Sequence, residues 1–543
     1  MKTTLARTLA SLLLVCITGS ACSALVGAPQ ATQAPRQYPT TEMDAPAKEW
    51  ALPATPAPLP TATVGSTFEL ETGASTGGTD EPNDKPYGDV FFEAYGVNPR
   101  IDTEDDHLST FAIDVDTASY TVMRRFITDG YLPDDDSVRV EEYVNYFEQG
   151  YAAPDDNAFA IYLEGAPSPY AENYHVLRVG VKGYDIDPEM RDDVVLTFVI
   201  DVSGSMDREN RLELVKDSLR LLVDALRPTD QVGIVVYGSE ARIVLPPTMV
   251  EERREILRAI QRLRPEGATN AEQGLILAYQ MASEAFDPAT TNRVILCSDG
   301  VANVGNTGPE SILNVIKAHA RDGIYLTTVG FGMGNYNDVL MEQLADNGDG
   351  FYAYVDDIKE AERVFVHNLP STLQVIARDA KIQVDFNPDV VSRYRLIGYE
   401  NRDVADEDFR NDAVDAGEIG LGHSVTALYE VKFHQDPLER IASMPALNVT
   451  LRWEDPDSGK VNEMNQMMLQ SDFTPEFAAT STRFQLAVVV AQYAEVLRSS
   501  YWAKEAGTSL NEIANEAQRL AKLLTRDGDV QEFAKLTARS IEL

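Results

Sequence analysis

Four short apolar runs in the middle of the chain alternate with amphipathic segments, and this alternation constrains the fold more than any other feature. A continuous apolar run of about four to eight residues is typical of a strand buried on both faces. Strands of this kind alternate with helices where a mainly parallel sheet is covered on both sides. The sequence therefore predicts a doubly wound α/β domain over residues 193–373, with strands at 194–200, 232–237, 293–297 and 324–329.

After residue 374 the apolar period changes to two, which predicts half-buried antiparallel strands over 374–475. We expect them to pair with strands of a module at 89–192, which carries one helical stretch at 117–131 and two alternating segments, so that the two modules form a flanking β-rich domain. Residues 476–543 turn helical again and begin one helix with the capping pair Ser509 and Glu512. We expect this last segment to be a small packing bundle without chemistry.

The first 21 residues predict an export signal, because Lys2 and Arg7 precede an apolar core that is too short to span a bilayer. The following "TGSAC" resembles a bacterial lipobox and implies lipidation of Cys22, although Gly19 stands where such a box usually carries leucine. An ordinary secretory signal is the alternative. Residues 22–88 are rich in Pro, Thr, Ala, Ser and Gly and predict a disordered linker. We therefore expect an exported cell-envelope protein that a lipid anchor alone holds at the membrane.

Acidic residues outnumber basic ones by 86 to 46, which gives a formal net charge of -40. Such a chain repels phosphate backbones and anionic lipid headgroups, so nucleic acid is excluded as a partner and divalent cations become plausible ligands. The six histidines show no zinc-binding spacing. If Cys16 is removed with the signal and Cys22 is acylated, Cys297 is the remaining thiol, and its apolar strand predicts a buried, inert side chain.

Polar residues follow the predicted strands in three loops. Ligands of an open parallel sheet bind beyond the carboxyl ends of its strands, and carboxylate and hydroxyl oxygens suit Mg²⁺, Mn²⁺ or Ca²⁺. Two carboxylates supply only two negative charges, so a bound dication would stay open to an external carboxylate. Read alone, "DVSGS" at 201–205 favours a turn that caps the next helix, and only the three loops together favour a metal site. The candidate ligands are Asp201, Ser203, Ser205, Thr269 and Asp299.

The segments "DVSGS", "GATN" and "CSDG" resemble, in this order, the von Willebrand factor A domain with its metal-ion-dependent adhesion site. All five candidate ligands fall on the pattern of that family. The segments "STFAIDVDTASY", "VRVEEYVNYF", "GYENR" and "LADNGDGFYAYVDD" are similar to bacterial YfbK-type lipoproteins over residues 89–540. The resemblance implies divalent-cation-dependent binding of a protein that offers an aspartate or glutamate carboxylate, and not catalysis.

Three other motifs favour structural interpretations. "AIDVDTASY" is similar to the Asp-x-Asp start of phosphotransferases at Asp114 and Asp116, but Ala118 stands where that family has threonine or valine. We favour a structural role in which these aspartates and Thr117 cap the following helix. "GFGMGN" at 330–335 lacks the third glycine of a dinucleotide loop and predicts a flexible loop beside the metal site. "EDPDSGK" at 454–460 lacks the last glutamate of a calcium loop and predicts a hairpin turn.

Together these features predict a lipid-tethered envelope protein whose central domain binds a partner protein through a divalent cation. One alternative is a structural scaffold of an envelope complex, in which the cation stabilises the fold. A phosphotransfer enzyme that uses Asp114 and Asp116 ranks last, because no histidine lies in the three loops to act as a general base.

Overall fold

The computed structural model describes residues 92–543, apart from 114–115, 155–156, 187–189, 301–308, 333–336, 369–372, 413, 415, 435–443 and 457. The chain divides into two units, residues 1–72 and 73–543, and all described residues lie in the second. The export signal, Cys22 and the linker therefore lie outside the described residues. Within the described part, no helix is long and apolar enough to cross a membrane.

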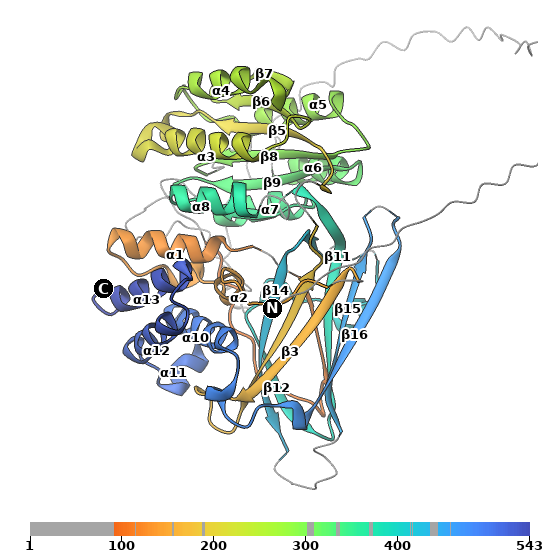
Figure 1. Cartoon of the computed structure of the whole chain (residues 1–543), viewed down its shortest axis with the longest axis vertical. Coiled ribbons are helices and arrows are strands. Elements are labelled where there is room, and N and C mark those ends of the chain that lie inside the picture. Colours follow the sequence, from red (N-terminus) through yellow and green to blue (C-terminus); the bar gives the residue numbers. More distant parts are fainter. Residues whose placement is uncertain are drawn as a thin grey trace, which may run out of the picture. The chain divides into compact units, whose positions relative to one another are not determined.

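The central domain contains a six-stranded sheet in the order β10-β9-β8-β5-β6-β7 (Figure 1). All neighbours are parallel except the edge strand β7, which runs antiparallel to β6. The four predicted apolar runs all form strands of this sheet, so the predicted α/β fold is confirmed. The strands are β5 (Val194–Asp201), β6 (Gln231–Tyr237), β7 (Ala241–Met249), β8 (Thr291–Ser298), β9 (Ile324–Gly330) and β10 (Tyr352–Tyr354).

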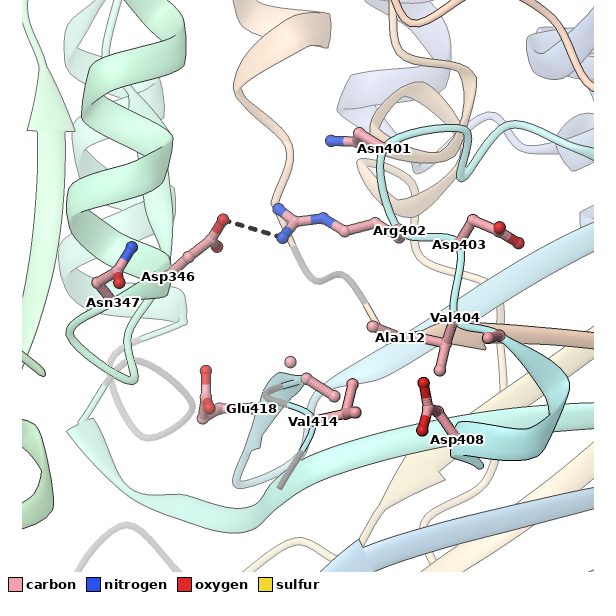
Figure 2. A pocket seen from close by; sticks show the side chains of 13 residues that line it. Ala112, Asp346, Asn347, Asn401, Arg402, Asp403, Val404, Asp408, Val414 and Glu418 are labelled. Atoms are coloured by element: carbon pink, nitrogen blue, oxygen red, sulfur yellow. Dashed lines mark hydrogen bonds and ion pairs between the residues drawn. The ribbon is translucent and has the colours of Figure 1, made fainter. Parts of the chain in front are cut away.

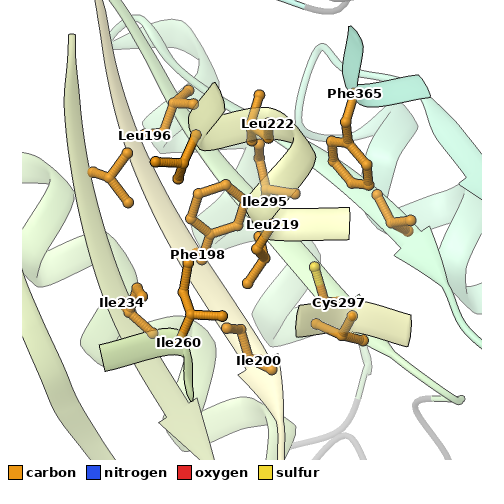
Figure 3. Packing of buried hydrophobic residues seen from close by; sticks show 14 of the residues in the cluster. Leu196, Phe198, Ile200, Leu219, Leu222, Ile234, Ile260, Ile295, Cys297 and Phe365 are labelled. Atoms are coloured by element: carbon orange, nitrogen blue, oxygen red, sulfur yellow. The ribbon is translucent and has the colours of Figure 1, made fainter. Parts of the chain in front are cut away.

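Helices cover both faces of this sheet because successive side chains of each strand point to opposite sides. Phe198 and Ile200 of β5 pack with Leu219 of α3 in one apolar cluster (Figure 3), whereas Val199 belongs to a second cluster with Leu275 of α5. Burying such a side chain contributes about 1.5–3 kcal/mol. The helices are α3 (Arg211–Ala225), α4 (Arg253–Arg262), α5 (Ala271–Glu284), α6 (Pro309–Arg321), α7 (Asp338–Asp346) and α8 (Ile358–Glu362).

The β-rich part consists of two sheets that share one apolar core, in which Val179 and Val425 of one sheet meet Val384 and Val449 of the other. One sheet has the order β1-β12-β14-β4-β3, and the other has the order β13-β11-β15-β16 with β2 also paired to β11. The bounds are β1 (Ile101–Asp102), β2 (Leu108–Ala112), β3 (Phe159–Pro167), β4 (His175–Gly183), β11 (Val375–Phe386), β12 (Val391–Ile397), β13 (Gly417–Gly420), β14 (Ser424–Phe433), β15 (Pro445–Glu454) and β16 (Val461–Leu469).

Strands from both sides of the central domain pair with each other, as predicted. The N-terminal strand β4 lies between β14 and β3, and β2 pairs antiparallel with β11. Figure 1 shows the orange β3 beside the blue β16. The β-rich part therefore forms only when two segments that the central domain separates in sequence come together.

The C-terminal helices pack together with two N-terminal helices, so the predicted small bundle is larger than the last segment alone. Tyr120 of α1 and Tyr143 of α2 share a core with Phe484 of α10 and Phe533 of α13. The predicted capping box of Ser509 and Glu512 is present at the start of α12. The helices are α1 (Ala118–Asp129), α2 (Val140–Asn145), α10 (Thr482–Leu497), α11 (Tyr501–Ala506), α12 (Leu510–Leu523) and α13 (Gly528–Ser540).

The predicted capping of α1 by Thr117 is wrong. Thr117 is the N-cap residue but its side chain makes no capping hydrogen bond. Instead, the Ser119 amide donates to the buried Glu142 carboxylate of α2 at 2.7 Å. A carboxylate from a neighbouring helix replaces the local cap, because any acceptor near a helix N-terminus can satisfy its free amides.

Candidate functional site

Two of the three candidate loops lie where strands of the central sheet end. The third does not: Thr269 lies in the loop between α4 and α5, so the prediction that all three loops follow strands is wrong. Asp201 is the last residue of β5, and Ser203 precedes the 3₁₀ turn Gly204–Asn210 that leads into α3. Asp299 directly follows β8. Since β5 and β8 are parallel neighbours, their carboxyl ends bring Asp201 and Asp299 to the same edge of the sheet.

The Asp201 carboxylate is fully buried and both of its oxygens accept hydrogen bonds. The Ser203 amide donates to Oδ1 at 2.7 Å, and the Ser298 hydroxyl donates to Oδ2 at 3.0 Å. The pKa of Asp201 is raised to about 6, because burial and the negative charge of Asp299 outweigh the lowering effect of the hydrogen bonds from Ser203 and Ser298. Asp201 is therefore a buried acceptor that orients its neighbours.

A chain of hydrogen-bonded oxygens joins the first loop to the third. The hydroxyl oxygens of Ser203 and Ser205 are 2.9 Å apart, and the Ser205 hydroxyl donates to Asp299 Oδ1 at 3.0 Å. Ser203 is buried, whereas Ser205 is partly exposed. The three side chains thus form one row of oxygen atoms that runs from the buried strand end toward solvent.

Thr269 lies in a loop that packs against the first one. The Gly204 amide donates to the Gly267 carbonyl at 3.1 Å, and the Glu266 amide donates to the Val202 carbonyl. Gly267 has φ of +60°, a left-handed conformation that glycine adopts without strain. Among the described residues, no hydrogen bond joins the partly exposed Thr269 hydroxyl to the other four candidates. The second loop therefore packs against the first through its backbone, and Thr269 follows two residues after Gly267.

Two residues at this site were not predicted from the sequence. Ser298 is the residue that donates to Asp201, and the Arg211 guanidinium donates through Nη1 to Asp299 Oδ2 at 2.6 Å. The Arg211 and Asp299 side chains are only 5% and 2% exposed. A cationic residue in the first turn of a helix, where anions are favoured, was the available signal for Arg211.

The oxygens present fit a small hard cation. Three hydroxyls and two carboxylates are donor types that Mg²⁺ and Mn²⁺ prefer, and two neighbouring buried carboxylates leave negative charge that a cation can offset. In the described part of the chain, no group of three or more His, Cys, Asp or Glu residues has the arrangement of a metal site. A soft-metal or multi-carboxylate site is therefore not offered elsewhere among those residues.

The remaining motifs have structural positions. Asp116 is buried and accepts a hydrogen bond from the Tyr352 amide of β10 at 2.9 Å, while Asp114 lies outside the described residues. The segment at 454–460 is the predicted turn of the β15–β16 hairpin. Cys297 is buried, and burial raises the pKa of its thiol. Within "GFGMGN" at 330–335, residues 333–335 are not described. Gly332 is described and lies against the Arg211 side chain.

A separate cavity of about 380 Å³ lies between the end of α7 and the loop around Arg402 (Figure 2). Arg402 and Asp346 face each other across it in an ion pair of 3.0 Å. Four acidic residues and one arginine line it, and none of the five candidate ligands contributes to it. The cavity is therefore distinct from the strand-end site.

Comparisons with known protein families cover most of the described chain. Residues 196–367 match the von Willebrand factor type A domain, residues 371–543 match the C-terminal domain "Uncharacterized protein YfbK, C-terminal", and residues 87–178 match a family described as von Willebrand factor. Domains of the type A family act in protein–protein interaction or adhesion.

Individual relatives agree with these matches. The chain is 37% identical over 471 residues to "Uncharacterized protein YfbK" of Escherichia coli, which covers 83% of this chain and 80% of that protein. It is 26% identical over 329 residues to "Uncharacterized protein sll0103" of Synechocystis, with coverage of 59% and 73%. Among solved structures, the von Willebrand factor type A protein from Catenulispora acidiphila aligns with a TM-score of 0.42 and 16% identity over 71% of this chain and 90% of that chain.

Proposed function

This chain belongs to the YfbK family, and from that premise we propose that its type A domain binds a partner protein through a divalent cation. The residues that would hold the cation are Asp201, Ser203, Ser205, Thr269 and Asp299. The row of oxygens from Ser203 through Ser205 to Asp299 is the observation that carries the proposal.

The candidate ligands would have different roles. The Ser203 and Ser205 hydroxyls and Asp299 Oδ1 lie in the row and would face the cation, with Thr269 completing the set from the second loop. Asp201 already accepts two hydrogen bonds, which favours a role as the buried acceptor that orients Ser203. When bound, the cation supplies an electrophilic position at which a carboxylate oxygen of the partner can replace water.

We extend the proposal to the place where the protein acts. The charged start and apolar core of residues 1–21, the "TGSAC" segment and the linker at 22–88 support export, lipidation of Cys22 and display on the cell envelope. These segments lie outside the described residues, and labelling with a radioactive or clickable fatty acid, compared between wild type and Cys22→Ser, tests the anchor directly.

Calorimetric titration with Mg²⁺ tests the cation site. We expect saturable binding to the wild type and its loss in Asp201→Ala, because the variant removes one of two buried negative charges and the acceptor of the Ser203 amide. Asp217→Ala is the matched control, since Asp217 lies on α3 but is exposed and pairs with the partly exposed Arg220. NaCl at equal ionic strength controls for screening of the net charge. Unchanged Mg²⁺ binding by Asp201→Ala would exclude this site.

A pull-down with the purified protein tests whether binding of a partner requires the cation. A pull-down from envelope extract should recover specific proteins with Mg²⁺ and lose them with EDTA or with Asp299→Ala. Recovery of the same partners in all three cases, together with a melting temperature that still rises with Mg²⁺, would favour the alternative in which the cation only stabilises a scaffold. The phosphotransfer alternative receives no support from Asp116, whose carboxylate is buried on the Tyr352 backbone.

A further inference from the structure

The Arg211 guanidinium is a permanent cation inside the proposed cation site. Its Nη1 donates to Asp299 Oδ2 at 2.6 Å, while the other oxygen of that carboxylate accepts from Ser205 at 3.0 Å. Asp299 Oδ1 therefore faces the serine row, where a metal ion would bind, whereas Oδ2 is paired with Arg211.

The fold makes specific room for this guanidinium. Gly332, after β9, has φ of +89°, and a Cβ atom at this position would lie only 2.3 Å from Arg211 Nε. The same loop is held to the third loop by the Phe331 amide, which donates to the Ser298 carbonyl at 2.8 Å. The Arg211 side chain is thus buried, although its Nε donor is not satisfied among the described residues.

The surrounding charges do not cancel Arg211. Glu209 Oε2 is 3.7 Å from Arg211, but the Glu209 side chain is 48% exposed and also pairs with Arg125 at 3.2 Å. Water screens such an exposed pair, whereas the Arg211 pair with Asp299 is buried. The two carboxylates of Asp201 and Asp299 and one guanidinium leave the buried site with one net negative charge. A bound dication would change this to one net positive charge.

We propose that Arg211 is a fixed countercharge that weakens cation binding and in return leaves the loaded site positive, so that it captures a partner's carboxylate more strongly. The inference rests on the proposed function and assigns Arg211 as a positioning and specificity-determining residue. Without Arg211 the same two carboxylates would neutralise a dication completely. The site would then hold the metal more tightly and attract a carboxylate less.

Arg211→Gln isolates this charge, because glutamine keeps a donor amide that can reach Asp299 while the positive charge is lost. In calorimetric titrations we expect Arg211→Gln to bind Mg²⁺ about tenfold more tightly than wild type. Arg211→Lys keeps the charge and should bind Mg²⁺ with wild-type affinity. Arg208→Gln, which removes an exposed arginine from the same segment, should also leave the affinity unchanged.

A second readout must move in the opposite direction. With Mn²⁺ bound, acetate serves as the carboxylate probe, and its displacement of metal-bound water is followed by water proton relaxation. We expect Arg211→Gln to need several-fold more acetate than wild type, roughly threefold or more. A residue with a merely structural role would weaken both binding events together, so tighter Mg²⁺ with weaker acetate is specific to a countercharge.

The outcomes separate this inference from the proposed function. If the wild type binds no Mg²⁺, the proposed function fails and the inference fails with it. If the wild type binds Mg²⁺ but Arg211→Gln binds it equally or more weakly, the inference alone is overturned. If Arg211→Gln does not fold, Gly332→Ala displaces the guanidinium while Arg211 remains, and it too should tighten Mg²⁺ binding; an unchanged affinity there would overturn the inference.

Discussion

Some residues at the strand ends can be predicted from a local sequence pattern, and others cannot. Asp201, Ser203 and Ser205 occupy alternate positions after an apolar run, and this local pattern is visible in the chain itself. Ser298 and Arg211 bind the two aspartates across 97 and 88 positions of sequence, and no local pattern indicates either contact. The identity of the polar loops is thus a local property, while the partner of each carboxylate depends on which strands become neighbours.

The pKa of His423 leads to a prediction about how the stability of the protein depends on pH. Burial, together with the positive charges of Lys182 and Arg293, lowers the pKa of its imidazole to about 4. The unfolded chain, with a histidine pKa of about 6.5, therefore binds a proton more readily than the folded chain between these values. Stability should be fully present above about pH 6.5 and fall as pH decreases toward about 4, by up to about 3 kcal/mol.

Urea unfolding at a series of pH values, compared between wild type and His423→Gln, measures this effect. The variant should show a flatter decline in the free energy of unfolding over the same range. His367→Gln is the control, because the His367 side chain is 67% exposed and should leave the acid dependence as in the wild type. A wild-type decline that persists in full in His423→Gln would show that another group titrates.

At the scale of elements, apolarity predicts the long buried strands of the central sheet, whereas the buried edge strand β10 has only three residues and was not predicted. The predicted strands of the central sheet are β5, β6, β8 and β9, and nearly all of their residues are buried. The edge strand β7 was not predicted, because its residues are mostly half-buried or exposed and two prolines, Pro246 and Pro247, interrupt the pattern. Edge strands are defined mainly by pairing with their neighbour, which the sequence of the strand does not encode.

The close packing of strand β13 against the end of β2 leads to a prediction about stability. It begins at Gly417, which lies so close to the backbone after β2 that a Cβ atom would be 1.8 Å from the Ile113 carbonyl oxygen. Because a backbone atom cannot move aside as a flexible side chain can, Gly417→Ala should separate β13 from the end of β2 and lower stability by about 2 kcal/mol or more. Urea unfolding and amide hydrogen exchange of β2 and β13 measure the change.

The matched control is Gly528→Ala, at the start of α13, where an added Cβ meets no atom within 4 Å. This variant should be neutral or slightly stabilising, because alanine is the better helix former. Equal stability of the two variants would contradict the close approach of β13 to Ile113.

At the scale of the whole molecule, the fold of the described residues depends on pairing between segments that are distant in sequence. Strand β4 lies between β14 and β3, so without the N-terminal module the five-stranded sheet keeps only β12 and β14. Tyr120 and Tyr143 likewise complete the core of the C-terminal helices. Arg124 of α1 adds a buried link to both other parts, through Asp356 and Glu532.

We therefore predict that residues 374–543 do not fold alone, although this segment nearly coincides with a family match of its own. Removing β4 and β2 exposes the edges and apolar faces of β14 and β11, and the remaining burial does not offset the chain entropy. A fragment expressed alone should give a poorly dispersed amide NMR spectrum and no cooperative thermal transition. Co-expression with residues 92–192 should restore both, whereas a dispersed spectrum from the isolated fragment would contradict the prediction.

The sequence by itself determined the α/β character of the central domain, the antiparallel strands that flank it and the polar loops that hold the five candidate ligands. These depend on hydrophobic periodicity and turn chemistry, which are local properties of a chain. The tertiary structure alone decided that Ser298 orients Asp201, that Arg211 lies on Asp299 in space left by Gly332, and that Asp116 binds the Tyr352 backbone. Such contacts join residues many positions apart, and only the packing of strands and helices brings them within hydrogen-bonding distance.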